Sequence, residues 1–301
     1  MEVVSCDWFS FSVLLPLDDD EKKNGAHLLC PDGYTLREYT GTNIYKKRYM
    51  LFNEFGEKSL TLLLEPYSIK LIKSNSMFVE VANRLLYRDF SFVLDLVSRV
   101  HIFSFQSVSR FDVCADFNPS VSQWQVIEWL QDAQAYVTGK REGSMYYDYV
   151  IPMAGGLQKR VARCLSWGSK ASNIKWKLYN KTLEITEVTD KGIQFCNKPY
   201  IRDMWERNGL DPSNVWRLEV SIMGAASYQW RGEKVNWDCH KIEYYTPFFW
   251  DIYNYRFVIR ANQGHKNRGH DEVLQFLTTP STSHYRLRKA DPRGDVYHTD
   301  H

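Results

Sequence analysis

Residues 110–117 constrain the fold most strongly, because their side chains alternate strictly between two kinds. The even-numbered positions carry Arg110, Asp112, Cys114 and Asp116, whereas the positions between them are Phe, Val, Ala and Phe. Successive side chains of a β-strand point to opposite faces of the sheet. The pattern therefore predicts a strand that has one face in a core and carries two carboxylates on the other.

A second segment, residues 216–221, alternates in the same way. Arg217, Glu219 and Ser221 fall on one face, and Trp, Leu and Val fall on the other. If this strand pairs with the first one, the carboxylate of Glu219 shares a surface with the two aspartates. Carboxylates that converge on a sheet face are the ligands preferred by hard divalent cations such as Mg²⁺ or Mn²⁺.

Strand geometry limits this metal hypothesis, which has Asp112, Asp116 and Glu219 as its candidate ligands. Positions four apart on a regular strand are separated by about 13 Å, so one ion cannot bind both aspartates unless the strand is bulged. We therefore expect one aspartate to act with Glu219. The alternative is that Arg110 and Arg217 form structural ion pairs with these acids.

A tyrosine surrounded by lysines provides the candidate nucleophile. In a strand over residues 174–181, one face carries Lys175, Lys177, Tyr179 and Lys181. Nearby positive charge lowers the pKa of a tyrosine, and lysines can also hold phosphate oxygens. Tyr179 is thus the candidate nucleophile, with Lys177 and Lys181 to neutralise charge in the transition state. The alternative is a solvated lysine face with an amphipathic tyrosine.

The net charge is only +2, so a polyanionic partner requires a local basic patch. Residues 151–183 contain seven Lys or Arg and no Asp or Glu, and residues 253–270 are also free of acids. Trp167 and Trp176 are candidates for stacking on unpaired bases, with core packing as the alternative. The candidate DNA contacts are Lys159, Arg160, Arg163, Lys170, Lys175, Arg256, Arg260, Lys266 and Arg268.

The remaining patterns predict an α+β fold with two antiparallel sheet units and helices packed on their faces. The predicted boundaries are a main domain over 1–225, with units at about 1–105 and 106–225, an extension over 226–277 and a polar tail over 278–301. Predicted strands cover 3–15, 48–55, 59–65, 67–73, 109–117, 163–168, 173–180 and 215–223. Predicted helices cover 81–100, 118–139 and 184–208, the last of them interrupted at Gly192 and Pro199.

The sequence contains no run of about 18 apolar residues and no basic segment followed by an apolar one at its start. We therefore expect neither a membrane span nor secretion. The six cysteines are scattered and include no Cys-x-x-Cys pair, which argues against a zinc ribbon or a disulfide scaffold. We expect reduced, mostly buried thiols and a cytoplasmic location.

The sequence carries four ordered motifs, which are residues 7–11 (DWFSF), 109–116 (SRFDVCAD), 168–172 (GSKAS) with 177–181 (KLYNK), and 216–219 (WRLE). They resemble those of the replication initiation factor family, the rolling-circle initiators of small plasmids and filamentous phages, which are related to relaxases of some conjugative elements. The resemblance spans roughly residues 3–225. Two departures are Lys170, where the family often has Arg, and Asn180, where Asp is also common.

This resemblance implies a sequence-specific nickase in which a tyrosine attacks one phosphodiester at the origin, stays linked to the 5′ phosphate and leaves a 3′ hydroxyl. Tyr179 matches the family tyrosine, and Asp112, Asp116 and Glu219 match its acids. The implied cofactor is Mg²⁺ or Mn²⁺. The implied partners are origin DNA, double-stranded for recognition and single-stranded for cleavage, a second copy of the chain, and the host helicase and polymerase. A non-catalytic replication regulator and a two-metal nuclease that acts through water are the alternatives.

Overall fold

The computed structural model describes residues 2–70, 72–87, 91–138, 146–152, 158–169, 171–188, 194–264, 270–278 and 285–289. Among the side chains, those of residues 91, 146–152, 158–163, 188 and 237 lie outside the description.

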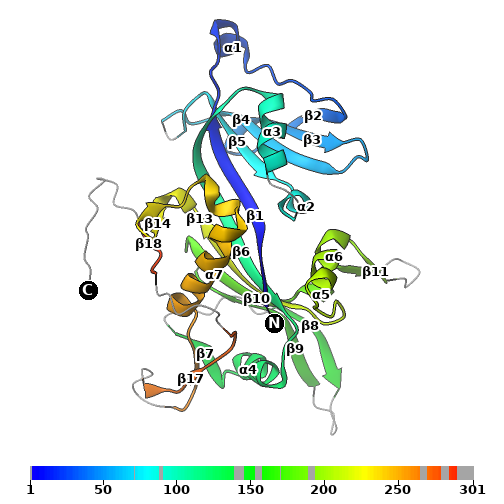
Figure 1. The fold of residues 1–301 in the computed structure, drawn as a ribbon, viewed down its shortest axis with the longest axis vertical. Coiled ribbons are helices and arrows are strands. Elements are labelled where there is room, and N and C mark those ends of the chain that lie inside the picture. The colour runs from blue at the N-terminus through cyan, green and yellow to red at the C-terminus, as the bar shows by residue number, and fades with distance from the viewer. Residues whose placement is uncertain are drawn as a thin grey trace.

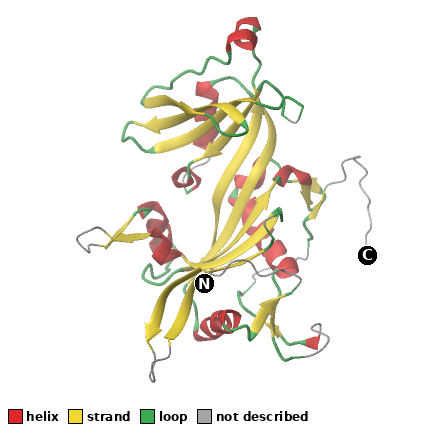
Figure 2. Cartoon of the chain, turned by 180° about the vertical axis from the view of Figure 1, so that it is seen from behind, coloured by secondary structure: helices red, strands yellow, loops and turns green. Residues whose placement is uncertain are grey.

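One antiparallel sheet runs through the length of the molecule (Figures 1 and 2). In the described chain it has ten strands, in the order β2-β3-β4-β5-β1-β6-β13-β10-β9-β8. These strands are β1 (Glu2–Leu14), β2 (Tyr34–Thr40), β3 (Tyr45–Asn53), β4 (Lys58–Pro66), β5 (Ser76–Val81), β6 (Ser104–Phe117), β8 (Tyr146–Pro152), β9 (Gln158–Trp167), β10 (Ile174–Asn180) and β13 (Trp216–Met223).

The long strands β1 and β6 lie at the middle of this sheet and pair with each other from Glu2 opposite Phe117 to Leu14 opposite Ser104. Their pairing joins the strands of the first predicted unit to those of the second. The predicted α+β class with antiparallel strands is confirmed. The two sets of strands are continuous in one sheet, with helices on both of its faces (Figure 2).

One face of the sheet is covered by α3 (Ser91–Val100) and α7 (Ile242–Arg256). Phe111 of β6 packs against Phe248 of α7 with ring centroids 5.3 Å apart. Trp176 of β10 is fully buried, and its ring centroid lies 4.8 Å from that of Phe257, which follows α7. Each such buried ring stabilises the fold by about 1.5–3 kcal/mol through its removal from water. This core forces the alternate residues of β6, β10 and β13 onto the opposite face.

The opposite face is partly covered by α2 (Asn83–Leu86), α5 (Lys181–Ile185) and α6 (Pro199–Arg207). A small separate core holds α5 and α6 together, and it consists of Ile185, Ile201, Trp205, Leu210 and Val215. The polar side chains of the central strands therefore point into a space that is bounded by short helices.

Shorter elements complete the described chain. They are α1 (Asp19–Asn24), α4 (Val121–Gln131), β7 (Ala135–Val137), β11 (Thr186–Val188), β12 (Gln194–Cys196), β14 (Tyr228–Trp230), β15 (Glu233–Lys234), β16 (Ile259–Ala261), β17 (Val273–Leu274) and β18 (Arg288–Lys289). Within the described chain, every helix is too short or too polar to cross a bilayer.

Two predictions for the first half of the chain are wrong in detail. In the strand expected over 67–73, the described residues 67–70 and 72–73 form a connection in which Ile69 is 71% exposed. The strand that follows is instead β5. The helix expected over 81–100 is divided into α2 and α3. The alternation of apolar residues at 67–73 led to a wrong strand prediction, because the described residues of this segment bury neither face.

Two further helix predictions are corrected. Ser120, and not Asn118, caps α4 by accepting a hydrogen bond from the Gln123 backbone N–H, because Asn118 bonds the carbonyls of Asp211 and Asn214. This helix ends at Gln131 and is followed by β7. The helical stretch expected over 184–208 does restart at Pro199, where α6 begins, but its first part holds the end of α5 and the strand pair of β11 and β12. All six cysteines are free thiols, and three of them are buried.

Candidate active site

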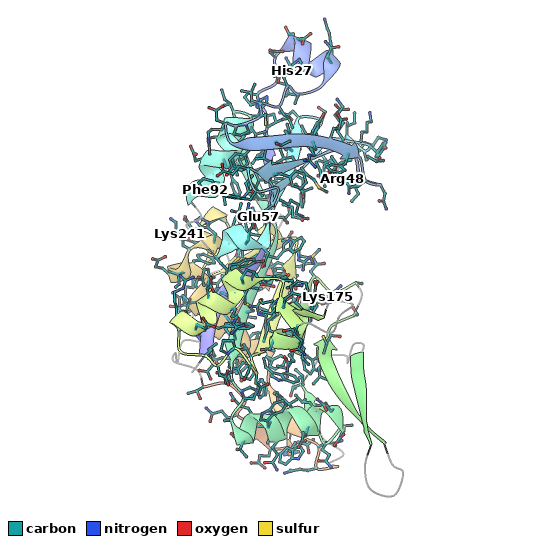
Figure 3. All side chains as sticks on the ribbon, turned by 90° about the vertical axis from the view of Figure 1, so that its right-hand side faces the viewer. His27, Arg48, Glu57, Phe92, Lys175 and Lys241 are labelled. Carbon is teal, nitrogen blue, oxygen red and sulfur yellow. The ribbon has the colours of Figure 1, made fainter. Side chains whose placement is uncertain are left out.

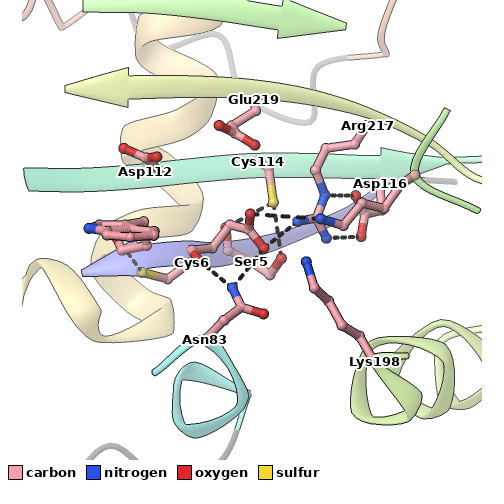
Figure 4. A network of polar contacts seen from close by, with 12 residues as sticks. Ser5, Cys6, Asn83, Asp112, Cys114, Asp116, Lys198, Arg217 and Glu219 are labelled. Carbon is pink, nitrogen blue, oxygen red and sulfur yellow. Dashed lines mark hydrogen bonds and ion pairs between the residues drawn. The ribbon is translucent and has the colours of Figure 1, made fainter. Parts of the chain in front are cut away.

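The three predicted acids lie on the same face of the paired strands β6 and β13. In the register of these strands Asp112 is opposite Ser221, Cys114 is opposite Glu219, and Asp116 is opposite Arg217. Figure 4 shows Asp112 and Glu219 near each other, with Asp116 beside Arg217 further along the strands. Asp112 and Glu219 therefore form a pair, and Asp116 lies apart from them.

Asp116 is neutralised by a buried ion pair. Its Oδ1 accepts a 2.6 Å hydrogen bond from Arg217 Nε, and its Oδ2 accepts bonds from Arg217 Nη2 at 2.7 Å and from Trp205 Nε1 at 2.6 Å. Both partners of the pair are fully buried. The alternative of a structural ion pair therefore describes Asp116 better than a metal-ligand role does.

Asp7 is a further acid at this site, which the sequence prediction missed. It is the extra residue of a β-bulge in β1, since Cys6 pairs with Val113 while Trp8 pairs with Asp112. Such a bulge re-aims a side chain, and Oδ1 of Asp7 here contacts Arg217 and accepts a 2.9 Å hydrogen bond from Tyr87. The only signal in the sequence is a lone carboxylate in an apolar strand.

The charges around Asp7 keep its carboxyl ionised. Burial by itself would raise the pKa of Asp7, but the positive charges of Arg217 and Lys181 outweigh burial and hold that pKa well below its usual range. Asn83 also donates a 3.1 Å hydrogen bond to Oδ1 of Asp7. Asp7, Arg217 and Asp116 thus form one buried network that fixes this end of the site.

Tyr179 lies next to a buried carboxylate. Its phenolic hydroxyl donates a 2.9 Å hydrogen bond to Glu219 Oε2 and accepts one of 3.4 Å from Lys181 Nζ. Lys181 begins α5 and is almost fully buried, where it pairs with Glu184 at 2.7 Å. The predicted nucleophile and one predicted lysine are therefore in contact.

The expected effect of the lysines on the pKa of Tyr179 is wrong. Burial raises the pKa of this phenol well above its ordinary value, and the negative charge of Glu219 raises it further, although Arg217 acts in the opposite direction. In this structure Tyr179 is therefore a neutral phenol whose proton points at a carboxylate. Such an arrangement suits removal of the proton by a base during attack.

Asp112 and Glu219 form the remaining acidic pair. Ser221 Oγ donates a 3.3 Å hydrogen bond to Glu219 Oε1, and Lys177 Nζ lies 3.5 Å from the same oxygen. Asp112 pairs with Arg110, whose Nε is 2.9 Å from Oδ1. Burial raises the pKa of Asp112 to about 7; the Arg110 hydrogen bond opposes that increase, and the charge of Glu219 adds to it.

The carboxylates of this site are hard oxygen donors of the kind that a divalent cation binds. In the described part of the chain, no three His, Cys, Asp or Glu side chains are grouped as a metal site. Mg²⁺, however, is commonly held by one or two carboxylates together with water and substrate phosphates. Asp112 and Glu219 supply two hard oxygen donors whose mutual repulsion a cation would relieve, so these two acids fit the ion and Asp116 does not.

The three predicted DNA contacts that the structure describes, Lys175, Arg256 and Arg260, do not share one surface. Lys175 lies on the same strand face as Tyr179, on the side from which β8 and β9 extend (Figure 3). Arg256 and Arg260 bond the backbone carbonyls of Leu287 and Asp271, and Arg256 ends α7 on the opposite side of the sheet from Tyr179. Outside the described residues or side chains are Lys159, Arg160, Arg163, Lys170, Lys266 and Arg268.

The tryptophans proposed to stack on bases lie in the core. Trp167 is 4% exposed and Trp176 is fully buried, so their alternative of core packing is correct. The indole of Trp8 is instead half-buried beside the acidic pair, with the Arg110 guanidinium 4.4 Å from its ring centroid. Trp8 is thus an aromatic residue of the site that composition and spacing did not single out.

Comparisons with known proteins add little to this site. No family model matches the sequence, and no curated protein does. Among solved structures, a similar chain is the rolling circle replication initiator protein from Geobacillus stearothermophilus, with 14% identity and a TM-score of 0.46 over 92% of this chain and 94% of the other. Any statement about function therefore depends on the site itself.

Proposed function

We propose that this chain initiates rolling-circle replication by nicking and rejoining one strand of origin DNA through a 5′-phosphotyrosine intermediate. The observation that carries the proposal is the hydrogen bond from Tyr179 to Glu219, with Lys181 on the same phenolic oxygen. A nucleophile that donates to a base, with a cation beside it, is the arrangement that covalent catalysis requires. The resemblance of the four sequence motifs supports the choice of DNA as substrate.

In the forward step, Tyr179 Oη attacks the scissile phosphorus while its proton passes to Glu219. The bond from phosphorus to the 3′ oxygen breaks, that oxygen takes up a proton, and the 5′ phosphate stays on the tyrosine. In the reverse step a 3′ hydroxyl attacks the phosphotyrosine, and the phenol takes back a proton. The bond energy is retained, so no nucleotide hydrolysis is needed.

The lysines of the site lie where negative charge would develop. Lys181 is held against Tyr179 by its pairs with Glu184 and, at 3.9 Å, with Asp7. Lys177 is 43% exposed at its side chain and can reach both Glu219 and a phosphate. Fixed cations aimed at a developing oxyanion contribute to catalysis because they need no reorganisation.

A divalent cation, Mg²⁺ or Mn²⁺, would be held by Asp112 and Glu219. When bound, it would neutralise the phosphate oxygens and favour departure of the 3′ oxygen. Asp116 belongs to the network of Arg217, which positions β13 and with it Glu219. The sequence left open which of the two aspartates acts with Glu219, and we propose that it is Asp112.

A second function, a DNA-binding regulator without catalysis, is favoured by the ion pairs of Asp112 with Arg110 and of Asp116 with Arg217. In that case the acids are structural and only the basic surface acts. The two functions differ in whether a DNA strand is cut.

The test uses a random-sequence single-stranded DNA library, because such a pool contains short recognition sequences of every kind. The wild-type chain with Mn²⁺ is expected to cut part of the pool, and Tyr179→Phe is expected to bind the pool equally well without cutting it. Tyr136→Phe, which loses a hydrogen bond to Asp271, is the matched control and should cut normally. Binding without cutting by the wild type would favour the regulator, and cutting by Tyr179→Phe would exclude Tyr179 as nucleophile.

A further inference from the structure

A pocket with a volume of about 690 Å³ opens on the sheet at some distance from Tyr179. Its floor is formed by β1, β5 and β6, and its walls come from residues 42–45 and from Ile72 and Lys73. Its lining includes Ser12, Tyr45, Phe78, Gln106, Ser107 and Ser109.

This pocket lies on the same sheet face as the candidate active site. Phe9, Phe11 and Val13 of β1 are fully buried in the core, so Trp8 and Ser12 point to the other face. Ser12 is opposite Ser107 of β6, as Trp8 is opposite Asp112. Ser107 and Asp112 are five positions apart in β6, which is roughly 16 Å at about 3.3 Å per residue.

The surface between the pocket and the acidic pair carries the stacked pair of Trp8 and Arg110. The Arg110 side chain is 27% exposed and holds Asp112, and in β6 Arg110 directly follows Ser109 of the pocket lining. Aromatic rings and guanidinium planes are the side chains on which unpaired bases stack. Trp8 and Arg110 therefore offer a stacking surface on the face that carries both Tyr179 and the pocket.

The lining of the pocket favours a neutral, planar ligand with hydrogen-bonding edges. The rings of Tyr45 and Phe78 lie 6.2 Å apart, and Ile44 and Leu63 add apolar surface. The polar groups are almost all uncharged: the hydroxyls and amides of Ser, Thr, Asn and Gln are joined by one cation, Lys73, and by no carboxylate. Ser76 bonds Gln106 at 3.3 Å, and Ser12 bonds Ser109 at 3.3 Å, so the floor is preorganised.

We propose that this pocket, the base pocket, holds an unpaired nucleobase of the DNA strand that Tyr179 cleaves. The proposal rests on the proposed function for the identity of that strand. A purine or pyrimidine matches the lining because its faces are apolar and its edges donate and accept hydrogen bonds. The base pocket would thereby anchor the strand a few nucleotides from the scissile phosphate.

The first test measures binding of a fluorescent oligothymidylate of about 16 nucleotides in EDTA, where no cutting occurs. Ser107→Trp fills the base pocket and is expected to weaken binding by about 5- to 150-fold, the loss of one stacked base. Thr35→Trp places the same ring on an exposed position of β2 and should bind as the wild type does. Equal binding by both variants would overturn the proposal.

The second test uses the wild-type chain, so that it does not depend on the folding of a variant. Photo-crosslinking with the same oligonucleotide carrying 5-iodouracil is expected to label peptides that contain Tyr45 or Phe78. Labelling confined to peptides outside the base pocket would overturn the proposal. If the wild type fails to cut DNA while Ser107→Trp weakens binding and the crosslink forms, the nicking function is wrong and the base pocket stands.

Discussion

Tyr179 and Glu219 lie on the neighbouring strands β10 and β13, and the phenol of Tyr179 donates a 2.9 Å hydrogen bond to the Glu219 carboxylate. Tyr179 and Glu219 are diagonal neighbours across the two strands. Lys177 is directly opposite Glu219, and Tyr179 is directly opposite Arg217. The geometry of the diagonal pair is fixed by a rigid sheet and not by a loop. A proton acceptor is therefore in place before any substrate arrives.

Glu219→Gln removes this proton acceptor and keeps the shape of the side chain. We expect DNA cutting at saturating Mn²⁺ to slow by about 10²–10⁴-fold, the usual contribution of a general base. Single-turnover cleavage gives the rate. Glu206→Gln, which alters an exposed ion pair with Arg202, is the control and should cut at the wild-type rate. An unchanged rate in Glu219→Gln would show that another group takes the proton.

Asp112→Asn should weaken Mn²⁺ binding by at least about 10-fold, because one of two carboxylate donors is lost. The measurement is calorimetric titration of the chain with Mn²⁺ in the absence of DNA. Asp203→Asn changes an exposed aspartate of α6 and should leave the affinity unaltered. Equal affinity in the wild type and Asp112→Asn would remove Asp112 from the metal site.

The raised pKa of Asp112 predicts a pH-dependent stability for the metal-free chain. In the folded state Asp112 keeps its proton up to about pH 7, whereas in the unfolded chain it loses the proton near pH 4. Folding therefore binds a proton between these values, and the contribution of Asp112 to stability falls as pH rises, by about 1.4 kcal/mol per pH unit. Denaturation in EDTA from pH 4 to 7 should show a smaller decrease for Asp112→Asn. Parallel curves for the two proteins would contradict this prediction.

Arg217→Met should destabilise the chain strongly, because it leaves Asp7 and Asp116 with uncompensated buried charge. Breaking a buried ion pair by removing one partner costs about 3–5 kcal/mol. The free energy of unfolding from chemical denaturation measures this loss. Arg202→Met, which breaks an exposed pair, should cost less than about 1 kcal/mol. A small effect of Arg217→Met would mean that the network is not structural.

The sequence was informative where one face of a strand is buried. The alternation of residues 110–117, 174–181 and 216–221 placed Asp112, Tyr179 and Glu219 correctly on polar faces, because burial of the intervening apolar residues leaves no other register. The alternation at 67–73 has the same form, but Ile69 is exposed. A pattern in a single sequence does not report whether a partner covers it.

The parts of the site that escaped prediction depend on contacts between distant segments. Asp7 enters the site through a bulge in β1, and a bulge has no fixed signature in the residues that form it. The sequence could not decide between a metal ligand and an ion-pair partner for Asp116, because Arg217 and Trp205, which bind it, are about 90–100 positions away in the chain. The pKa of Tyr179 was misjudged because the lysines are visible in the sequence and the burial is not.

The most direct test of the central claim is isolation of the covalent adduct. Wild-type chain is incubated with the single-stranded DNA that it cuts and Mn²⁺, the products are separated under denaturing conditions, and the protein peptide that carries nucleotide is sequenced by mass spectrometry. We expect one adduct, on Tyr179, and we expect EDTA to prevent its formation. An adduct on another residue, such as Tyr146, Tyr147 or Tyr149, or strand cutting with no adduct, would contradict the central claim.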